Sequence, residues 1–299
     1  MRPAFSIIFF TVMSGFGFGL GALVALNLIE MPEMSDKIWV LATIFIFAGA
    51  GLLSSTFHLG HPERAWRALT QWRSSWLSRE GVLAIITLDA ILGWFLYAHF
   101  VGTPPLWAGI AVSALCLATI FCTAMIYASL RTVARWNHPL TSVSYLAFGI
   151  ASGLVGLAAL TSLTSGASAS LAVAASWALV GAWGVKMVWW QVAGKSQQES
   201  TRETATGLGR LGSVRPLMPP HTSENYLQHE MGFQIGRKHA RTLRIIALSL
   251  GGALPLILLS ALPASPIALM LALIATLGGL FFERWLFFAE AKHVVMLYY

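Results

Sequence analysis

Long apolar segments limit what this chain can fold into more than any other feature of its sequence. Each contains about 20 residues, the length at which an α-helix crosses the hydrocarbon core of a bilayer. Every backbone amide in that core must be hydrogen-bonded within the protein, and a helix meets this requirement by itself. We therefore predict an all-α membrane protein, a bundle of about eight transmembrane helices. The predicted spans are residues 5–28, 38–57, 81–101, 107–130, 141–164, 170–193, 243–262 and 266–289.

The composition excludes the other broad classes of protein. Charged residues make up only 10% of the chain and apolar residues 57%, whereas a soluble domain carries about 25% charge. A soluble globule of this composition would expose large apolar patches, and disorder requires the opposite balance. Cys116 and Cys122 lie in one apolar segment without a Cys-x-x-Cys motif. We therefore expect no disulfide framework, and no iron–sulfur cluster or zinc held by this chain.

Lysine and arginine are distributed unequally between the two sides that the spans define. An even number of spans places both termini on one side, together with residues 58–80, 131–140 and 194–242, while the opposite side carries Lys37 beside acidic residues. The basic residues of the terminal side are Arg2, Arg64, Arg67, Arg73, Arg79, Arg131, Arg135, Lys195, Arg202, Arg210, Arg215, Arg237, Lys238, Arg241 and Lys292. Basic residues stay in the cytoplasm, so we predict a multi-pass protein of the bacterial inner membrane with both termini cytoplasmic. This distribution explains the net charge of +7 without a nucleic-acid partner.

Residues 194–242 form the longest connection in what we expect to be a single integral membrane domain covering residues 1–299. The connection begins with polar residues, and Pro216, Pro219 and Pro220 exclude regular helix from its middle. A loop of this length in a compact protein is usually functional. We interpret it as a cytoplasmic docking surface for a partner, with a disordered connector as the alternative.

The densest polar segment lies between the second and third predicted spans and contains His58, His61, Arg64, Trp76 and Glu80. Tryptophan and arginine are common anchors at a membrane boundary, and that explanation remains open for this segment. The two histidines are three residues apart and could share a helix face. Glu80 opens the next helix, so an imidazole and a carboxylate are expected at the same depth.

This combination suits the chemistry of a quinone at the rim of an apolar bundle. Reduction of a quinone needs hydrogen-bond donors for its carbonyl oxygens and a source of two protons, and imidazole serves both needs near neutral pH. His58 and Glu80 are therefore candidates for the catalytic pair at a site for ubiquinone or menaquinone. The predicted quinone-binding residues are His58, His61, Arg64, Trp76, Glu80 and Arg284. A single haem near the terminal side is an alternative. Its two histidine ligands would have to come from facing helices.

Several charged residues lie inside the predicted spans. Asp89 lies near the middle of the third span, and we expect either part of a proton path or a protonated acid bonded to a neighbouring helix. Lys186 is close enough to the cytoplasmic boundary to extend its ammonium group to water. Glu283 and Arg284 form either an ion pair or part of the cytoplasmic-side site.

Small and aromatic residues indicate how the helices pack and where the membrane ends. Glycine recurs at every second position from Gly15 to Gly21, a pattern typical of close helix packing rather than of a nucleotide loop. Tryptophans near the predicted cytoplasmic boundary fit an aromatic belt. These tryptophans are Trp66, Trp72, Trp76, Trp136, Trp189 and Trp190.

The segment from His58 to Ala65 reads His-Leu-Gly-His-Pro-Glu-Arg-Ala, and Leu77 to Glu80 reads Leu-Ser-Arg-Glu. Both resemble motifs of the membrane-anchor (C) subunit family of dimethyl sulfoxide reductase-type molybdoenzymes, at matching spacing. The eight-span pattern extends the resemblance over essentially the whole chain. It implies a partner iron–sulfur electron-transfer subunit and a partner molybdopterin catalytic subunit, which hold the molybdenum cofactor and the clusters. The family's quinone-site histidine and acid correspond to His58 and Glu80.

Two further segments are similar to a subgroup of this family that serves sulfite-oxidising enzymes. They run from Pro219 to Tyr226 and from Glu283 to Ala291. In the reductase anchors a glutamate and an arginine stand four residues apart at the end of the last helix, whereas Glu283 and Arg284 are adjacent here. The resemblance therefore assigns no role to these two residues.

The resemblance implies electron transfer from the iron–sulfur subunit to the quinone pool during cytoplasmic oxidation of sulfite to sulfate. The first alternative is a quinol-oxidising anchor of a dimethyl sulfoxide reductase-type enzyme. An anchor without a redox site is a second alternative. A small-molecule transporter, from a different class, would need broken helices and paired charges at mid-depth, for which Asp89 is the one candidate.

Overall fold

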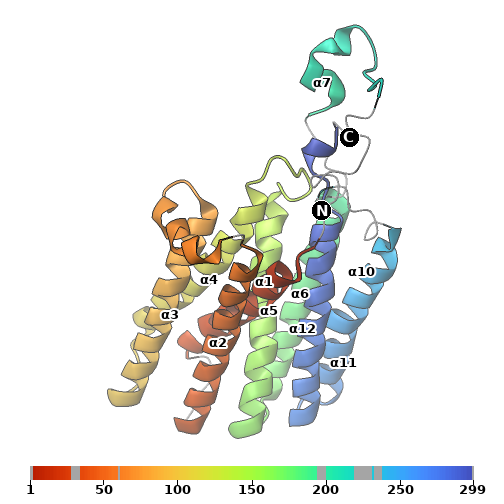
Figure 1. The fold of residues 1–299 in the computed structure, drawn as a ribbon. Helices are drawn as coiled ribbons and strands as arrows, with labels where there is room; N and C mark the ends of the chain where they lie inside the picture. The colour runs from red at the N-terminus through yellow and green to blue at the C-terminus, as the bar shows by residue number, and fades with distance from the viewer. Residues whose placement is uncertain are drawn as a thin grey trace.

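A computed structural model describes residues 3–27, 34–59, 61–193, 200–218, 231 and 238–297, with the backbone alone for Met34, Ser35 and His58. Within these residues, 8 helical segments are long and apolar enough to cross a membrane, which confirms the predicted all-α fold. Figure 1 shows them as one bundle. The spans are α1 (Phe5–Ala25), α2 (Met34–Ser54), α3 (Trp76–Phe100), α4 (Leu106–Ala128), α5 (Pro139–Thr164), α6 (Ala169–Val192), the continuous segment α10, η5 and α11 (Ala240–Leu248, Ser249–Ala253 and Leu254–Ala261), and α12 (Pro266–Ala289).

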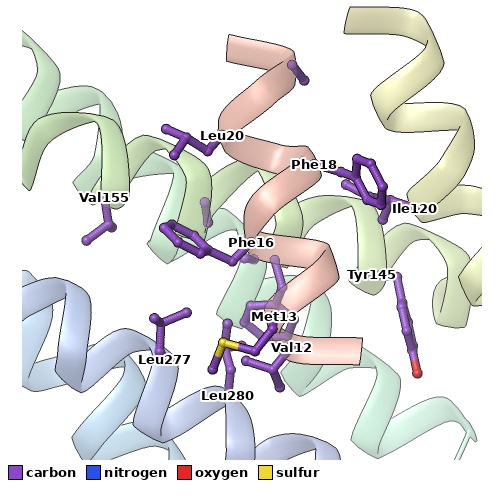
Figure 2. Packing of buried hydrophobic residues seen from close by; sticks show 14 of the residues in the cluster. Val12, Met13, Phe16, Phe18, Leu20, Ile120, Tyr145, Val155, Leu277 and Leu280 are labelled. Carbon is purple, nitrogen blue, oxygen red and sulfur yellow. The ribbon is translucent and has the colours of Figure 1, made fainter. Parts of the chain in front are cut away.

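Helix α1 lies at the centre of the bundle and contacts α2, α4, α5 and α12. Its glycines allow other backbones to approach closely, as the sequence predicts. A Cβ atom added to Gly19 would lie 1.9 Å from the carbonyl oxygen of Gly149 on α5, and one added to Gly17 would lie 2.6 Å from the Ala48 nitrogen on α2. Figure 2 shows large side chains such as Phe16 of α1 packed among the neighbouring helices. Backbone proximity and interlocking side chains together hold α1 in place.

The seventh span contains a π-helical turn, η5, between its two α-helical parts. At this turn Gly251 approaches Gly279 of α12, where an added Cβ atom would lie 2.9 Å from the Gly279 Cα. The Trp183 indole on α6 donates a hydrogen bond of 2.8 Å to the Gly251 carbonyl oxygen. The irregular turn therefore contacts α12 through the Gly251 backbone and α6 through the Gly251 carbonyl oxygen.

The connection between α2 and α3 forms two short 3-10 helices, η1 (Ser55–His58) and η2 (Pro62–Gln71). The expectation that His58 and His61 share a helix face is wrong, because the backbone between them leaves the helix. Leu59 is extended (φ −76°, ψ 132°), and His61 has φ −138° and ψ 73°. The connection lies at the same end of the bundle as α7 (Arg202–Thr206) and both chain ends (Figure 1). We call it the Glu80 end and the opposite one the Lys37 end.

Helix α3 begins at Trp76, five residues before the predicted start of the third span. The reason is a local cap. Ser75 has an extended backbone, and its side chain accepts a hydrogen bond of 3.4 Å from the Ser78 N–H. Glu80 therefore lies in the second turn of the helix.

We expect Gly19→Ala to destabilise the protein by about 1–3 kcal/mol, the usual cost of overpacking a filled core. The added methyl group would collide with the Gly149 backbone, which belongs to a helix and cannot move alone. Gly15→Ala is the matched control, because nothing lies within 4 Å of its added Cβ atom. Thermal unfolding of the full chain in detergent measures both variants. Equal melting temperatures would contradict the proposed backbone contact.

Candidate functional site

Glu80 is a buried carboxyl group near the start of α3. Its residue is 4% exposed, and its Oε1 atom has no hydrogen-bond partner within the described residues. The hydroxyl of Ser78 nearby also has none. The following residue, Gly81, faces Leu69 of η2, which covers this turn of the helix. A buried polar group without a partner costs stability, so Glu80 is a strong candidate for binding a ligand or a proton.

Trp76 and Arg79 fix the first turn of α3 against the preceding connection. The Arg79 guanidinium lies 4.3 Å from the centre of the Trp76 ring. It also donates hydrogen bonds to the carbonyl oxygens of Trp72 (2.9 Å) and Arg73 (2.6 Å). Trp76 in turn meets Phe121 of α4 edge to face, with ring centres 6.1 Å apart. The predicted site residue Trp76 therefore contributes to the placement of the turn that carries Glu80.

His61 and Arg64 lie on the outer surface of the connection. The His61 Nδ1 atom is 3.0 Å and the Arg64 Nε atom 3.6 Å from the same Glu63 carboxylate oxygen. All three side chains are exposed, so their ion pairs contribute little to stability. This position suits contact with another protein better than contact with the buried Glu80. The side chain of His58 lies outside the described atoms, and its predicted role stays a prediction.

Arg284 belongs to a separate buried group of charges. The Glu283 carboxylate contacts the Lys186 ammonium of α6, and its other oxygen lies 3.3 Å from the Arg284 guanidinium. The guanidinium also lies over the Tyr145 ring of α5, 3.6 Å from its centre. The predicted pairing of Glu283 with Arg284 is confirmed. The prediction that Lys186 reaches water is wrong, because Lys186 is 0% exposed and finds its counter-charge inside the bundle.

A second group of charges, the buried Glu290 with two half-buried arginines, repeats this arrangement one step nearer the Glu80 end. The Glu290 carboxylate lies 2.6 Å from Arg135 and 2.5 Å from Arg244. Burial lowers the pKa of the Arg135 guanidinium, and the Glu290 carboxylate opposes that change. The Trp189 ring contacts both groups, 3.7 Å from the Lys186 nitrogen and 5.1 Å from the Arg135 guanidinium carbon. Each acid therefore lies between two bases, and each group keeps one excess positive charge.

Three of the tryptophans predicted for an aromatic belt are core residues instead. Trp136, Trp189 and Trp190 are buried. The Trp136 indole donates to the Phe287 carbonyl oxygen at 2.9 Å, and the Trp189 indole donates to the Thr141 hydroxyl at 3.0 Å. An indole whose N–H donates to an acceptor inside the protein is satisfied without a position at the membrane–water interface.

The expectation of an internal position for Asp89 is also wrong. Its side chain is exposed on the outer surface of α3 and makes no hydrogen bond or ion pair with any described residue. Helix α3 has the smallest buried share of all the spans, which explains why a residue halfway along it faces outwards. Asp89 therefore gives no support to a proton path through the bundle or to a transporter.

A small cavity adjoins Arg284 and is lined by Tyr145, Thr123 and Ser152. Its volume of about 20 Å³ is enough for one water molecule. The Ser152 hydroxyl donates to the Phe148 carbonyl oxygen at 2.7 Å, so its lone pairs remain available inwards. The Tyr145 hydroxyl has no hydrogen-bond partner among the described residues. The cavity offers acceptors and donors to a water beside the buried charges, but it is too small for a quinone ring.

Sequence reasoning did not select Tyr145, Arg135, Arg244 or Glu290 as a group. The available signal was the spacing of Glu283 and Glu290, which are seven residues apart and so share a face of one helix. Two acids on one apolar face require basic partners on neighbouring elements. The identity of those partners depends on which helices touch, which this sequence alone does not show.

A family model for the DMSO reductase anchor subunit (DmsC) matches residues 1–289, and the chain belongs to this family of membrane-anchor subunits. The chain is also 34% identical to the C subunit of sulfite dehydrogenase from Allochromatium vinosum. That alignment covers 100% of this chain and 99% of the relative.

We expect Glu283→Gln to destabilise the protein by about 3–5 kcal/mol, because it leaves Lys186 and Arg284 as unpaired buried cations. Lys186→Met is the matched variant, and its cost should be clearly smaller because Glu283 keeps Arg284 as a partner. Thermal unfolding of the full chain in detergent compares the two. A larger loss in Lys186→Met than in Glu283→Gln would contradict the assigned charges.

Proposed function

We propose that this chain is the membrane-anchor and quinone-binding subunit of a molybdenum and iron–sulfur oxidoreductase. It passes electrons from the iron–sulfur subunit to the quinone pool during the oxidation of sulfite to sulfate in the cytoplasm. The observation that carries this proposal is the buried, unpartnered carboxyl group of Glu80 at the end of the bundle that carries the exposed connection. Membership of the anchor family and the similarity to the sulfite dehydrogenase C subunit support it.

In this reaction the chain supplies hydrogen bonds and protons to the quinone. Two electrons arrive from the partner subunits, which would hold the molybdenum cofactor and the clusters. The quinone takes up two protons, and an imidazole at His58 can donate a hydrogen bond to one carbonyl oxygen and pass on a proton. Glu80 can donate when protonated and accept when ionised. Its free Oε1 atom leaves it available to orient the ring or to supply a proton.

The charges of the two ends support a cytoplasmic position for the Glu80 end. Arg64, Arg67 and Arg73 are exposed on the connection at this end. Lys37 is the one lysine or arginine among the described residues at the other end. Under the positive-inside rule the Glu80 end faces the cytoplasm, and the partner subunits dock there.

The described part of the long connection offers a surface for such docking. Residues 200–218 project beyond the helix ends in Figure 1, and we call them the α7 loop. Thr201 and Thr204 cap each other's backbone N–H groups at the start of α7. The Arg202 guanidinium donates to the Leu297 carbonyl oxygen at 2.6 Å, which ties the loop to the C-terminal segment. Residues 194–199, 219–230 and 232–237 of the predicted docking loop lie outside the described residues.

The α7 loop exposes large apolar side chains although it lies away from the bundle. Leu211 is 86% exposed, Leu217 100% and Met218 75%. Glu203 holds the loop closed by accepting a hydrogen bond of 3.1 Å from the Val214 N–H, and hydrogen bonds from backbone N–H groups lower the pKa of its carboxyl group. A loop that exposes large apolar side chains fits a protein interface. We assign the α7 loop to the contact with the partner subunits.

We expect His58→Ala and Glu80→Gln each to reduce quinone-linked turnover by roughly 10²–10⁴-fold, the usual contribution of a positioned acid or base. Activity with a soluble dye, measured on the partner subunits, should remain. Asp89→Asn is the matched control, since it removes a carboxylate from the exposed face of the same helix. Unchanged quinone turnover in both site variants would favour an anchor without a redox site.

The direction of electron flow is tested with the same preparations. Sulfite-dependent quinone reduction that is lost in Glu80→Gln agrees with the proposal. Quinol-dependent reduction of a sulfoxide, lost in the same variant, would instead identify a quinol-oxidising anchor, the activity that the name of the family suggests.

We expect Leu211→Asp to weaken binding of the partner subunits by roughly tenfold or more, because burying an apolar anchor contributes more than about 1 kcal/mol in such interfaces. Ser213→Asp is the control, which adds the same charge to an exposed position of the same loop. The fraction of dye-linked activity retained on membranes measures both. Equal retention would show that the α7 loop does not form the contact.

A further inference from the structure

A cavity of about 460 Å³ opens at the Lys37 end, far from the residues that the proposed function uses. It lies between the C-terminal end of α1, the first half of α2, the second half of α3 and the start of α4. Figure 1 shows the lower ends of α2 and α3 standing apart. The reason is that α2 packs mainly on α1 and α3 mainly on α4, so that few residues fill the space between them.

Three side chains with hydrogen-bond donors line this cavity: Lys37, Trp94 and Asn27. The Trp94 indole N–H is buried without a partner among the described residues, and the half-exposed Lys37 and exposed Asn27 make no hydrogen bond to a described residue. Among the described residues, the neighbouring Asp36 carboxylate forms no ion pair with Lys37 and accepts a hydrogen bond of 2.5 Å from Ser165. Unpartnered donors beside an apolar floor indicate a ligand with acceptor oxygens and an apolar body.

The depths of the donors distinguish between ligands of this kind. Lys37 lies in the first turn of α2, at the boundary where the headgroups of one leaflet begin. Trp94 lies six residues before the end of α3 at Phe100, about 9 Å further into the membrane. Ile44 and Ile91, near mid-membrane, form the apolar inner end. From the boundary inwards, the cavity lining therefore matches the order of the phosphate, ester carbonyl and acyl chain in a phospholipid.

We propose that this cavity binds one glycerophospholipid of the leaflet at the Lys37 end. Lys37 and Asn27 hold the phosphate, the Trp94 indole donates to an ester carbonyl oxygen, and one acyl chain lies between Ile44 and Ile91. An anionic phosphate at this position also explains why the single basic residue described at this end lines the cavity. The lipid would complete the contact between α2 and α3, the helix with the smallest buried share.

The test is phospholipid retention by the full chain, purified in mild detergent and analysed by mass spectrometry. The wild type should retain one phospholipid that Lys37→Glu loses. Titration of delipidated chain with phosphatidylglycerol should show affinity lower by roughly tenfold or more in the variant, the scale of a lost charge-assisted hydrogen bond. Arg131→Glu is the control, because it reverses an exposed charge at the Glu80 end.

A second pair of variants tests the cavity without changing a charge. Ala98→Trp fills the cavity, whereas Leu96→Trp adds the same side chain to an exposed position of α3. Loss of the retained phospholipid in Ala98→Trp but not in Leu96→Trp supports the site. If Lys37→Glu does not fold, this pair of variants alone tests whether the cavity binds the lipid. Equal retention by the two tryptophan variants would overturn the proposal. Retention of a phosphorus-free quinone that Ala98→Trp displaces would overturn it as well.

Discussion

The close approach of α1 to its neighbours is the contact on which the rest of the bundle depends. Lipid tails are as apolar as leucine, so burial of apolar side chains does not by itself bring helices together in a bilayer. Gly17 and Gly19 bring the α1 backbone against α2 and α5, where dispersion contacts and interlocking side chains stabilise the pair. Helix α4 also packs on α1 and supports α3. The position of Glu80 therefore depends on contacts that lie far from it.

Buried charges organise the other half of the bundle. Glu283 and Glu290 lie on one helix, and each carboxylate joins bases from two different elements. Removing these charges from water is costly, and the cost is offset only when every acid finds its partners. The arrangement thus selects one packing of α6, α10 and α12 over others. It also adds buried positive charge near the Glu80 end, in the same direction as the exposed arginines there.

Much of the fold could be predicted from the sequence, because a bilayer accepts few kinds of span. The helical spans, the glycine packing of α1 and the pairing of Glu283 with Arg284 are confirmed. The errors at Asp89 and Lys186 share one physical cause. Asp89 and Lys186 are single charges in apolar segments, and the sequence does not show which face of a helix is covered. The Lys186 side chain points inwards and contacts Glu283, whereas Asp89 lies on an outer face of α3. The predicted roles of His58 and Glu80 remain predictions.

The proposed quinone site lies on the weakly covered helix α3. A quinone reaches a protein from the bilayer, so its binding residues must lie close to lipid, while a proton-carrying acid must be shielded from it. Glu80 meets both conditions, because it is buried under η2 and α4 contacts on a helix whose remaining surface is largely open. A helix held mainly from one side needs support elsewhere. Arg79 and Trp76 supply that support at one end of α3, and the cavity beside Trp94 marks where it is missing at the other.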